Sequence, residues 1–228
     1  MCGRLTQVRA IDLFRAIVRL INDPPVAARY NAVPTQAIAA VRQLPGSGDR
    51  EVALLHWGLI PSWSKDPAVG ARMINARAET VADKPAFRAP FRRRRCLIPA
   101  DGFYEWQKVN GNKQPYYIHP QDEERPFALA GLWDHWEGGE GSHVESCTIL
   151  TTAANDLLRP LHDRMPVILD PADFDLWLDP GVQNPEAVLP LLRPYPDAAM
   201  ACYPVGRYVN NPRNDGPECV APLDRGTS

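Results

Sequence analysis

Short, largely apolar segments recur over most of the chain, and this pattern predicts strands. Each segment is bounded by turn-forming residues such as Gly, Pro, Asn and Asp, as is typical of short strands. Asn110, Gly111 and Asn112 separate two such segments, 102–109 and 115–119, and predict a tight hairpin. The other predicted strands are 38–41, 51–59, 96–99, 127–133, 144–152, 166–169 and 198–203.

Helical spacing of apolar residues is found mainly near the two ends of the chain. We expect Thr6 to cap a first helix whose apolar stripe consists of Ile11, Phe14, Ile17 or Val18, and Ile21. Further helices are predicted at 153–161, 171–178 and 185–192. Together these elements predict an α+β fold with mixed, mostly antiparallel, curled and barrel-like sheets and peripheral helices. No repeat or linker interrupts the pattern, so residues 1–228 are expected to form a single domain.

Composition narrows the classes of protein to which the chain can belong. With 228 residues, 45% of them apolar, it can bury a substantial core. A net charge of -2 excludes a strongly basic nucleic-acid-binding protein but is compatible with a local basic groove. No apolar run approaches the ~18 residues of a membrane span, and no signal peptide is recognisable. We therefore expect a cytoplasmic protein without membrane contact.

The cysteines are scattered singly along the chain and none belongs to a C-x-x-C pair. This spacing predicts reduced thiols and argues against a zinc site, so no metal and no cofactor are expected. The five cysteines are Cys2, Cys96, Cys147, Cys202 and Cys219.

Cys2 is the first candidate for chemistry because of its position behind Met1. Its small side chain predicts that an aminopeptidase removes Met1, which leaves an amine with a pKa of about 8 and a thiol with a pKa of about 8.5 on one residue. Such an amine condenses with an aldehyde to an imine, and the thiol then closes a thiazolidine ring. The alternative is that Cys2 is simply a small buried residue.

Glu105 and His162 are candidate proton carriers. Strand alternation places Glu105 on the same face as Phe103, and a carboxyl beside aromatic rings favours its protonated form, which suits a general acid. His162 lies in a polar loop between a predicted helix and a strand, where an imidazole can shuttle protons. The alternatives are a solvent-facing Glu105 and a structural His162 bonded to a backbone carbonyl.

Other polar and aromatic residues suggest a binding surface. Asn75 can orient a substrate hydroxyl or an imine, and Arg77 can hold a phosphate, although both also suit a turn followed by an exposed helix start. The arginines at 92–95 form either a phosphate track or a solvated face. Trp57 and Trp63 provide either a stacking platform for bases or core side chains.

Short blocks along the whole chain resemble the SOS response-associated peptidase (SRAP) family, the abasic-site-processing proteins of bacteria and eukaryotes. The blocks are MCGR at 1–4, YNAVPTQ at 30–36, WGLIPSW at 57–63, NARAET at 75–80, RCLIPADGFYEW at 95–106, AGLW at 130–133, TILTT at 148–152 and HDRMPVIL at 162–169. Each block is short, but eight blocks in the same order are highly specific. The resemblance implies a mixed α/β fold with curled sheets and a basic channel.

The resemblance also implies an activity and its catalytic residues. Cys2 would bond covalently to the ring-opened sugar of an abasic site in single-stranded DNA. Glu105 would be the acid that helps open the sugar and later reverses the link. His162 would shuttle protons during imine formation, and Asn75 would hold the Cys2 amine and the sugar in attack geometry.

The DNA-binding residues follow from the same resemblance. Arg4, Arg77 and Arg164 would contact phosphates, whereas Trp63 and Pro34 would support a bent strand. The implied partner is single-stranded DNA that contains abasic sites, bound by a monomer that associates with the nucleoid on damaged DNA.

Two other functions remain as alternatives to a DNA-lesion crosslinker. The first is a cysteine peptidase in which His162 is the base for the Cys2 thiol, with removal of residues ahead of Cys2 as its autoproteolytic activity. The second is a non-catalytic module that binds single strands, for which Cys2 would be dispensable.

Overall fold

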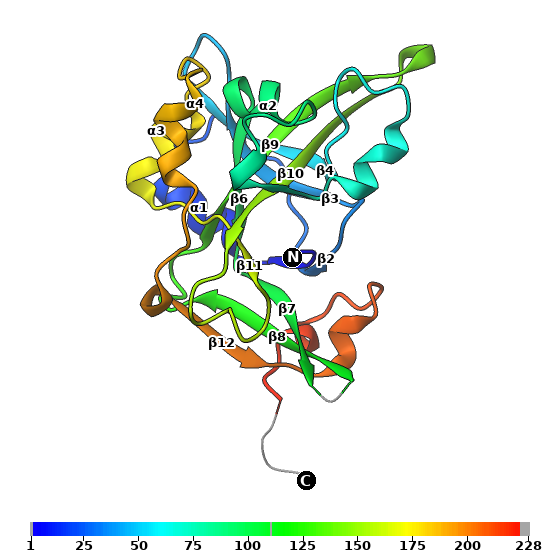
Figure 1. Ribbon diagram of the computed structural model, residues 1–228, viewed down its shortest axis with the longest axis vertical. Coiled ribbons are helices and arrows are strands. Elements are labelled where there is room, and N and C mark those ends of the chain that lie inside the picture. The colour runs from blue at the N-terminus through cyan, green and yellow to red at the C-terminus, as the bar shows by residue number, and fades with distance from the viewer. Residues whose placement is uncertain (1, 110, 224–228) are drawn as a thin grey trace.

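A computed structural model describes residues 2–109 and 111–223 of the chain, and a closed barrel forms its centre. Four of the five neighbouring strand pairs in the barrel are antiparallel, and the pair β4–β10 is parallel. The barrel strands are β3 (Ala37–Gln43), β4 (Arg50–Trp57), β6 (Arg95–Ala100), β9 (Phe127–Glu137) and β10 (His143–Ala153). Figure 1 shows long strands β9 and β10 rising through the upper half of the molecule.

Two short strands extend the barrel at the C-terminal half of β10. β5 (Asn75–Arg77) runs parallel to β10, with Asn75 opposite Ile149. β11 (Arg164–Pro166) pairs antiparallel with β10, with Arg164 opposite Ala153. Because both short strands pair with β10, the blocks at 75–80 and 162–169 are brought to one region of the barrel.

A second, antiparallel sheet lies below the barrel in Figure 1. Its strand order is β12 (Met200–Pro204), β8 (Asn112–Pro120), β7 (Gly102–Val109), β1 (Leu5–Gln7) and β2 (Arg29–Ala32). Only Asp101 separates β6 of the barrel from β7 of this sheet. The chain therefore passes from the barrel directly into the strand that carries Glu105.

Alternating residues of the barrel strands belong to two different apolar clusters, as the period of two along a strand requires. One cluster, which includes Ile98 and Ile149, contains residues from all barrel strands. The other, which includes Leu97 and Leu150, packs against the helices. Phe14 and Phe174 stack there with ring centroids 5.3 Å apart.

The helices are short and lie at the periphery of the molecule. They are α1 (Ala10–Ile17), α2 (Arg88–Arg93), α3 (Phe174–Leu178) and α4 (Pro185–Val188). The predicted α+β fold with mixed, mostly antiparallel, barrel-like sheets and peripheral helices is confirmed. No helix in the described part of the chain has the length and apolarity needed to cross a bilayer.

Two predictions about local structure are wrong. Thr6 does not cap a helix, because it lies in β1 and its hydroxyl bonds to the Gly102 carbonyl at 3.2 Å and the Tyr117 hydroxyl at 2.9 Å. The first helix ends at Ile17, so Ile21 is not part of its stripe. Residues 153–161 do not form a helix, because Ala153 is the last residue of β10 and residues 156–161 form turns. Pro160 lies within these turns and has no backbone N–H to donate to a helical hydrogen bond.

The predicted hairpin is confirmed. β7 and β8 pair in register from Phe103 opposite Ile118 to Val109 opposite Asn112. Of the three predicted turn residues, Asn110 lies outside the described residues.

Candidate active site and groove

The first residues of the chain enter between the barrel and the second sheet, where Figure 1 marks the N-terminus. Cys2 is fully buried and belongs to the apolar cluster of the barrel strands. The Asn75 side-chain amide donates a hydrogen bond to the Cys2 carbonyl at 2.9 Å. β5 therefore fixes the backbone of Cys2, whereas the predicted removal of Met1 concerns a residue outside the described part of the chain.

Glu105 lies on β7 and is 3% exposed, so the alternative of a solvent-facing carboxyl is wrong. Phe103 shares the apolar cluster of Cys2, whereas the rings of Tyr104 and Trp106 meet on the other face of the strand at 6.4 Å. Burial raises the pKa of Glu105, and the nearby His162 acts in the opposite direction. The carboxyl therefore stays protonated to a higher pH than an ordinary glutamate does.

The thiol of Cys2 is in an environment that disfavours its ionised form. Burial raises its pKa far above the ordinary value, and the neighbouring Glu105 carboxyl raises it further. A hydrogen bond from the Arg4 backbone amide acts in the opposite direction but is the smaller effect. The thiol is therefore neutral at physiological pH.

His162 lies in the turn between β10 and β11, with its side chain 31% exposed. Its Nδ1 lies 3.0 Å from the Arg164 backbone amide and 2.8 Å from Asp163 Oδ1. Nδ1 without a proton accepts from the Arg164 amide, whereas Nδ1 with a proton donates to the Asp163 carboxylate.

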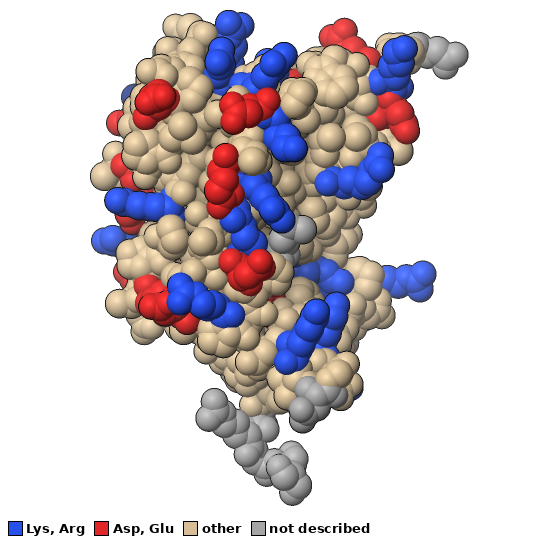
Figure 2. Space-filling model, viewed as in Figure 1, with Lys and Arg blue, Asp and Glu red and all other residues tan. Residues whose placement is uncertain are grey.

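A groove of about 520 Å3 opens beside these residues. In Figure 2 the surface is indented between its upper and lower parts, and Lys and Arg side chains border the indentation. The groove brings together the N-terminal segment, both proton-carrier candidates and basic side chains of the hairpin. Its lining consists of Gly3, Arg4, Glu105, Trp106, Lys108, Lys113, His162 and Asn210.

Arg4 forms part of the groove wall, and its guanidinium is held by residues behind that wall. Its guanidinium donates to Asn31 Oδ1 at 2.9 Å and to the Val209 carbonyl at 2.5 Å, and lies 5.6 Å from the centre of the Trp106 ring. Trp106 Nε1 donates to Asn210 Oδ1 at 2.8 Å. The C-terminal segment thus orients both side chains along the groove.

The other predicted DNA-binding residues lie outside the lining of this groove. Trp63 is 65% exposed, Arg77 is exposed on β5 and Pro34 is half-buried. Arg164 is tied into the protein, because it forms a bidentate pair with Glu79 at 2.5 and 2.9 Å and donates to the Thr151 carbonyl at 2.6 Å.

Some of the tryptophans and arginines predicted to form a stacking platform and a phosphate track are buried, and the others are exposed. Trp57 is fully buried and its Nε1 donates to the Ile74 carbonyl at 3.0 Å, so Trp57 is a core residue. Arg95 is 4% exposed and donates to backbone carbonyls including that of Phe91 at 2.8 Å. Arg94 pairs with the buried Asp134 at 3.1 Å. Within the run, Arg92 and Arg93 are the solvated members.

Three groups of groove residues were missed from the sequence. Lys108 and Lys113 are implied by the hairpin register, which places them opposite each other, so the sequence carried a signal for them. Trp106 was noted only as a strand residue. Asn210 reaches the groove from a distant segment, and no local pattern marks it.

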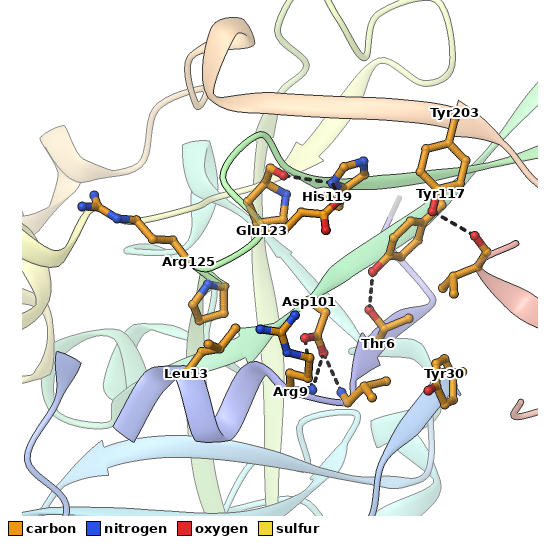
Figure 3. A pocket seen from close by; sticks show the side chains of 14 residues that line it. Thr6, Arg9, Leu13, Tyr30, Asp101, Tyr117, His119, Glu123, Arg125 and Tyr203 are labelled. Carbon is orange, nitrogen blue, oxygen red and sulfur yellow. Dashed lines mark hydrogen bonds and ion pairs between the residues drawn. The ribbon is translucent and has the colours of Figure 1, made fainter. Parts of the chain in front are cut away.

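A second pocket, of about 280 Å3, lies at the other end of β1 (Figure 3). Several of its polar groups are bonded within the protein. Asp101 accepts the backbone amides of Val8 and Arg9 at 2.5 and 3.1 Å, and His119 Nδ1 lies 2.9 Å from the Pro120 carbonyl. We therefore place the candidate site in the groove. The described residues contain no group of three His, Cys, Asp or Glu arranged to hold a metal.

Comparison with known proteins defines the class to which this fold and groove belong. The family model of the SOS response associated peptidase (SRAP) matches residues 1–212. The chain belongs to the SRAP family, as the eight sequence blocks indicated.

Relatives cover nearly the whole chain. It is 41% identical over 224 residues to the abasic site processing protein YoqW of Bacillus subtilis, which covers 96% of this chain and 99% of YoqW. It is 36% identical to the abasic site processing protein HMCES of Gallus gallus, over 82% of this chain and 62% of HMCES. A crystal structure of a protein from Bacteroides thetaiotaomicron superposes with a TM-score of 0.83 at 28% identity, over 97% of this chain and 100% of that one.

Proposed function

We propose that this protein processes abasic sites in single-stranded DNA by capturing the ring-opened sugar as a thiazolidine on Cys2. The names of its relatives supply the substrate class. The observation that carries the proposal is the position of Cys2, which Asn75 holds beside a buried carboxyl at an open groove bordered by basic side chains. No base-reading element is needed, because the lesion lacks a base.

The proposed reaction needs no oxidant or reductant. After removal of Met1, the Cys2 amine adds to the sugar aldehyde, and loss of one water gives an imine. The thiol sulfur then bonds to the imine carbon while its proton passes to the nitrogen. A neutral thiol suits this order, because the amine attacks first and the thiol only closes the ring.

The surrounding side chains have distinct roles in this sequence. Protonated Glu105 donates to the sugar oxygen during ring opening and to the departing water. His162 carries protons between the intermediates and solvent. Asn75 Oδ1 is buried and accepts no hydrogen bond from a described residue, so it can accept one from the Cys2 amine.

Binding of the undamaged part of the strand is assigned to the half-buried Arg4 and to the exposed Arg77 and Trp63. Arg4 and Arg77 supply contacts to phosphates, which weaken as salt rises. Trp63 offers an exposed ring for stacking, supported by the loop at Pro34. Arg164 can take part only if its pair with Glu79 opens.

A peptidase reaction is less well supported by the same geometry. Such an enzyme attacks with a thiolate, and burial raises the thiol pKa of Cys2. Autoproteolysis of residues ahead of Cys2 is the form of this reaction that the family name suggests.

The experiment uses an oligonucleotide that carries one uracil, treated with uracil-DNA glycosylase to create an abasic site. We expect a band that survives denaturing electrophoresis with the wild type and is absent with Cys2→Ala. Inserting one Lys after Met1 should block the removal of Met1 and abolish the band. Cys96→Ala is the matched control, because Cys96 is also fully buried.

Reductive trapping separates the two steps of capture. Cys2→Ala retains an amine without a thiol, so borohydride should trap its imine as a stable adduct. Cleavage of unrelated peptides without a DNA adduct would instead support the peptidase. Equal binding by the wild type and Cys2→Ala without any adduct would support a non-catalytic single-strand-binding module.

A further inference from the structure

Two of the chain's four lysines, Lys108 and Lys113, lie directly opposite each other on β7 and β8. Both are exposed, and both line the groove together with Glu105 and His162. The two lysines therefore lie closer to the hairpin turn than Glu105 does, at that end of the groove.

Like charges directly opposite each other across two strands are destabilising. The barrel shows the usual arrangement, because Arg42 on β3 lies opposite Glu51 on β4 and bonds to it at 2.8 Å. By contrast, no carboxylate among residues 2–109 and 111–223 forms an ion pair with Lys108 or Lys113. A bound anion would remove the repulsion that the fold leaves in place.

The distance along β7 fits a strand that leaves the catalytic site. Lys108 is three residues beyond Glu105, which corresponds to about 10 Å at the rise of an extended strand. At this odd spacing Lys108 shares the strand face of Trp106, opposite to that of Glu105, and both faces border the groove at this end of the hairpin. Trp106 and Asn210 line the groove between them. At about 3.4 Å or more per nucleotide, this distance is covered by about three nucleotides or fewer.

We propose that Lys108 and Lys113 together hold one phosphate of the DNA strand, within about three nucleotides of the abasic sugar. This phosphate clamp rests on the proposed function, because it takes the sugar at Glu105 as its reference point. A phosphodiester carries one negative charge and fits between two flexible ammonium groups. The clamp adds affinity and fixes the direction of the strand without reading its sequence.

The clamp is tested with an oligonucleotide that carries tetrahydrofuran at the abasic position, which binds but cannot open to an aldehyde. Fluorescence anisotropy should give about a tenfold higher Kd for the double variant Lys108→Ala, Lys113→Ala. The slope of log K against log salt should fall by about 0.7, the value for one phosphate contact in a single strand. The double variant Lys108→Arg, Lys113→Arg should retain the wild-type slope.

The matched control removes two other exposed cations, Arg19 and Arg193, which lie outside the groove lining. Arg19→Ala with Arg193→Ala should leave both Kd and slope at wild-type values. Neutral methylphosphonates placed at one phosphate at a time should weaken the wild type at a single position near the lesion. At that position the lysine double variant should lose nothing further.

Equal Kd and salt slope for the wild type and the lysine double variant would overturn the clamp. The clamp would also be overturned if the lysine double variant lost affinity but no single methylphosphonate weakened the wild type. The proposed function is tested separately, because covalent capture is measured with the wild type and a true abasic site, whereas the clamp is measured by binding to the tetrahydrofuran analogue. Absence of any adduct with the wild type would count against the function and leave the binding test intact.

Discussion

Cys2, at the side of the barrel that faces the groove, and the barrel cysteines Cys96 and Cys147 share one apolar cluster but have different polar neighbours. Cys96 and Cys147 lie in the barrel among apolar side chains, where burial raises the pKa of Cys96 to about 12 and that of Cys147 well above its ordinary value. Burial raises the pKa of Cys2 as well. Thiol acidity therefore does not distinguish the candidate nucleophile from two core residues.

Polar neighbours distinguish Cys2. Its carbonyl is held by Asn75, and the buried Glu105 carboxyl lies beside it at an open groove. A buried carboxyl is costly where an apolar residue would serve packing better. Under the proposed function, the polar surroundings of Cys2 serve chemistry at its amine, whereas the apolar surroundings of Cys96 and Cys147 serve packing of the barrel.

The largest expected effect follows from exchanging one cysteine in each region. Cys2→Ala should abolish stable capture of abasic DNA, because no thiol remains to close the ring. Cys147→Ala should retain capture and lower the free energy of unfolding by about 1–3 kcal/mol, because it leaves a cavity in the barrel. Denaturing electrophoresis measures capture and urea titration measures stability. Stable capture by Cys2→Ala without a reductant would contradict the distinction between Cys2 and the barrel cysteines.

The next largest effect concerns buried and exposed carboxyls. Glu105→Gln should slow capture and its reversal by about 10²- to 10⁴-fold, because an amide cannot act as an acid. Glu145→Gln, which alters an ion pair with Arg42 on the barrel, should leave the rate unchanged. Quenched time courses in both directions measure the rates, and an unchanged rate in Glu105→Gln would exclude the acid role.

The same substitution has a predicted pH dependence of stability. The folded pKa of Glu105 is raised by burial above the ordinary value of 4.5. The protonated carboxyl makes its full contribution to the free energy of unfolding below pH 4.5, and this contribution is lost as the pH rises through the raised pKa. Glu105→Gln should therefore gain stability relative to the wild type across that window. Parallel thermal unfolding curves at several pH values would show no such divergence if the carboxyl were solvated.

A smaller effect is expected from the two arginines near β10. Arg164→Ala should slow capture at saturating DNA by up to about 100-fold, because it releases the loop that holds His162. Arg77→Ala should leave that rate unchanged and lower the salt slope by about 0.7. The capture rate of Arg164→Ala is compared with that of His162→Ala, which removes the imidazole itself. A lowered salt slope in Arg164→Ala would instead place Arg164 on a phosphate.

The smallest effect on function is expected from a pair of tryptophans. Trp63→Ala should weaken binding to single strands by about 1–3 kcal/mol, because an exposed ring is lost for stacking. Trp57→Ala should lower stability by about 3–5 kcal/mol, because Trp57 is fully buried. Anisotropy and urea titration measure the two quantities. Equal stability losses in both variants would place Trp63 in the core instead.

The fold class was accessible from the sequence because strand alternation and turn chemistry act locally. The β7–β8 hairpin illustrates this, since the sequence Asn110–Gly111–Asn112 predicts a tight hairpin and Val109 lies opposite Asn112. Thr6 was mispredicted because it lies in β1 and bonds to Gly102 and Tyr117. Residues 153–161 were mispredicted because β10 extends to Ala153 and Pro160 cannot donate a helical hydrogen bond.

The candidate site could be predicted from the sequence only in part. Alternation predicted the strand face of Glu105 but left its burial open, and the bond from Asn75 to Cys2 depends on β5 joining the barrel. The engagement of Arg164 with Glu79 and the position of Asn210 arise from contacts between segments far apart in sequence. A local pattern contains no signal for such contacts.

The most direct test of capture by the Cys2 amine and thiol is the intact mass of the protein before and after reaction with abasic DNA. We predict a chain without Met1, and an adduct whose mass equals protein plus oligonucleotide minus one water. An adduct formed by protein that still carries Met1 would contradict the account.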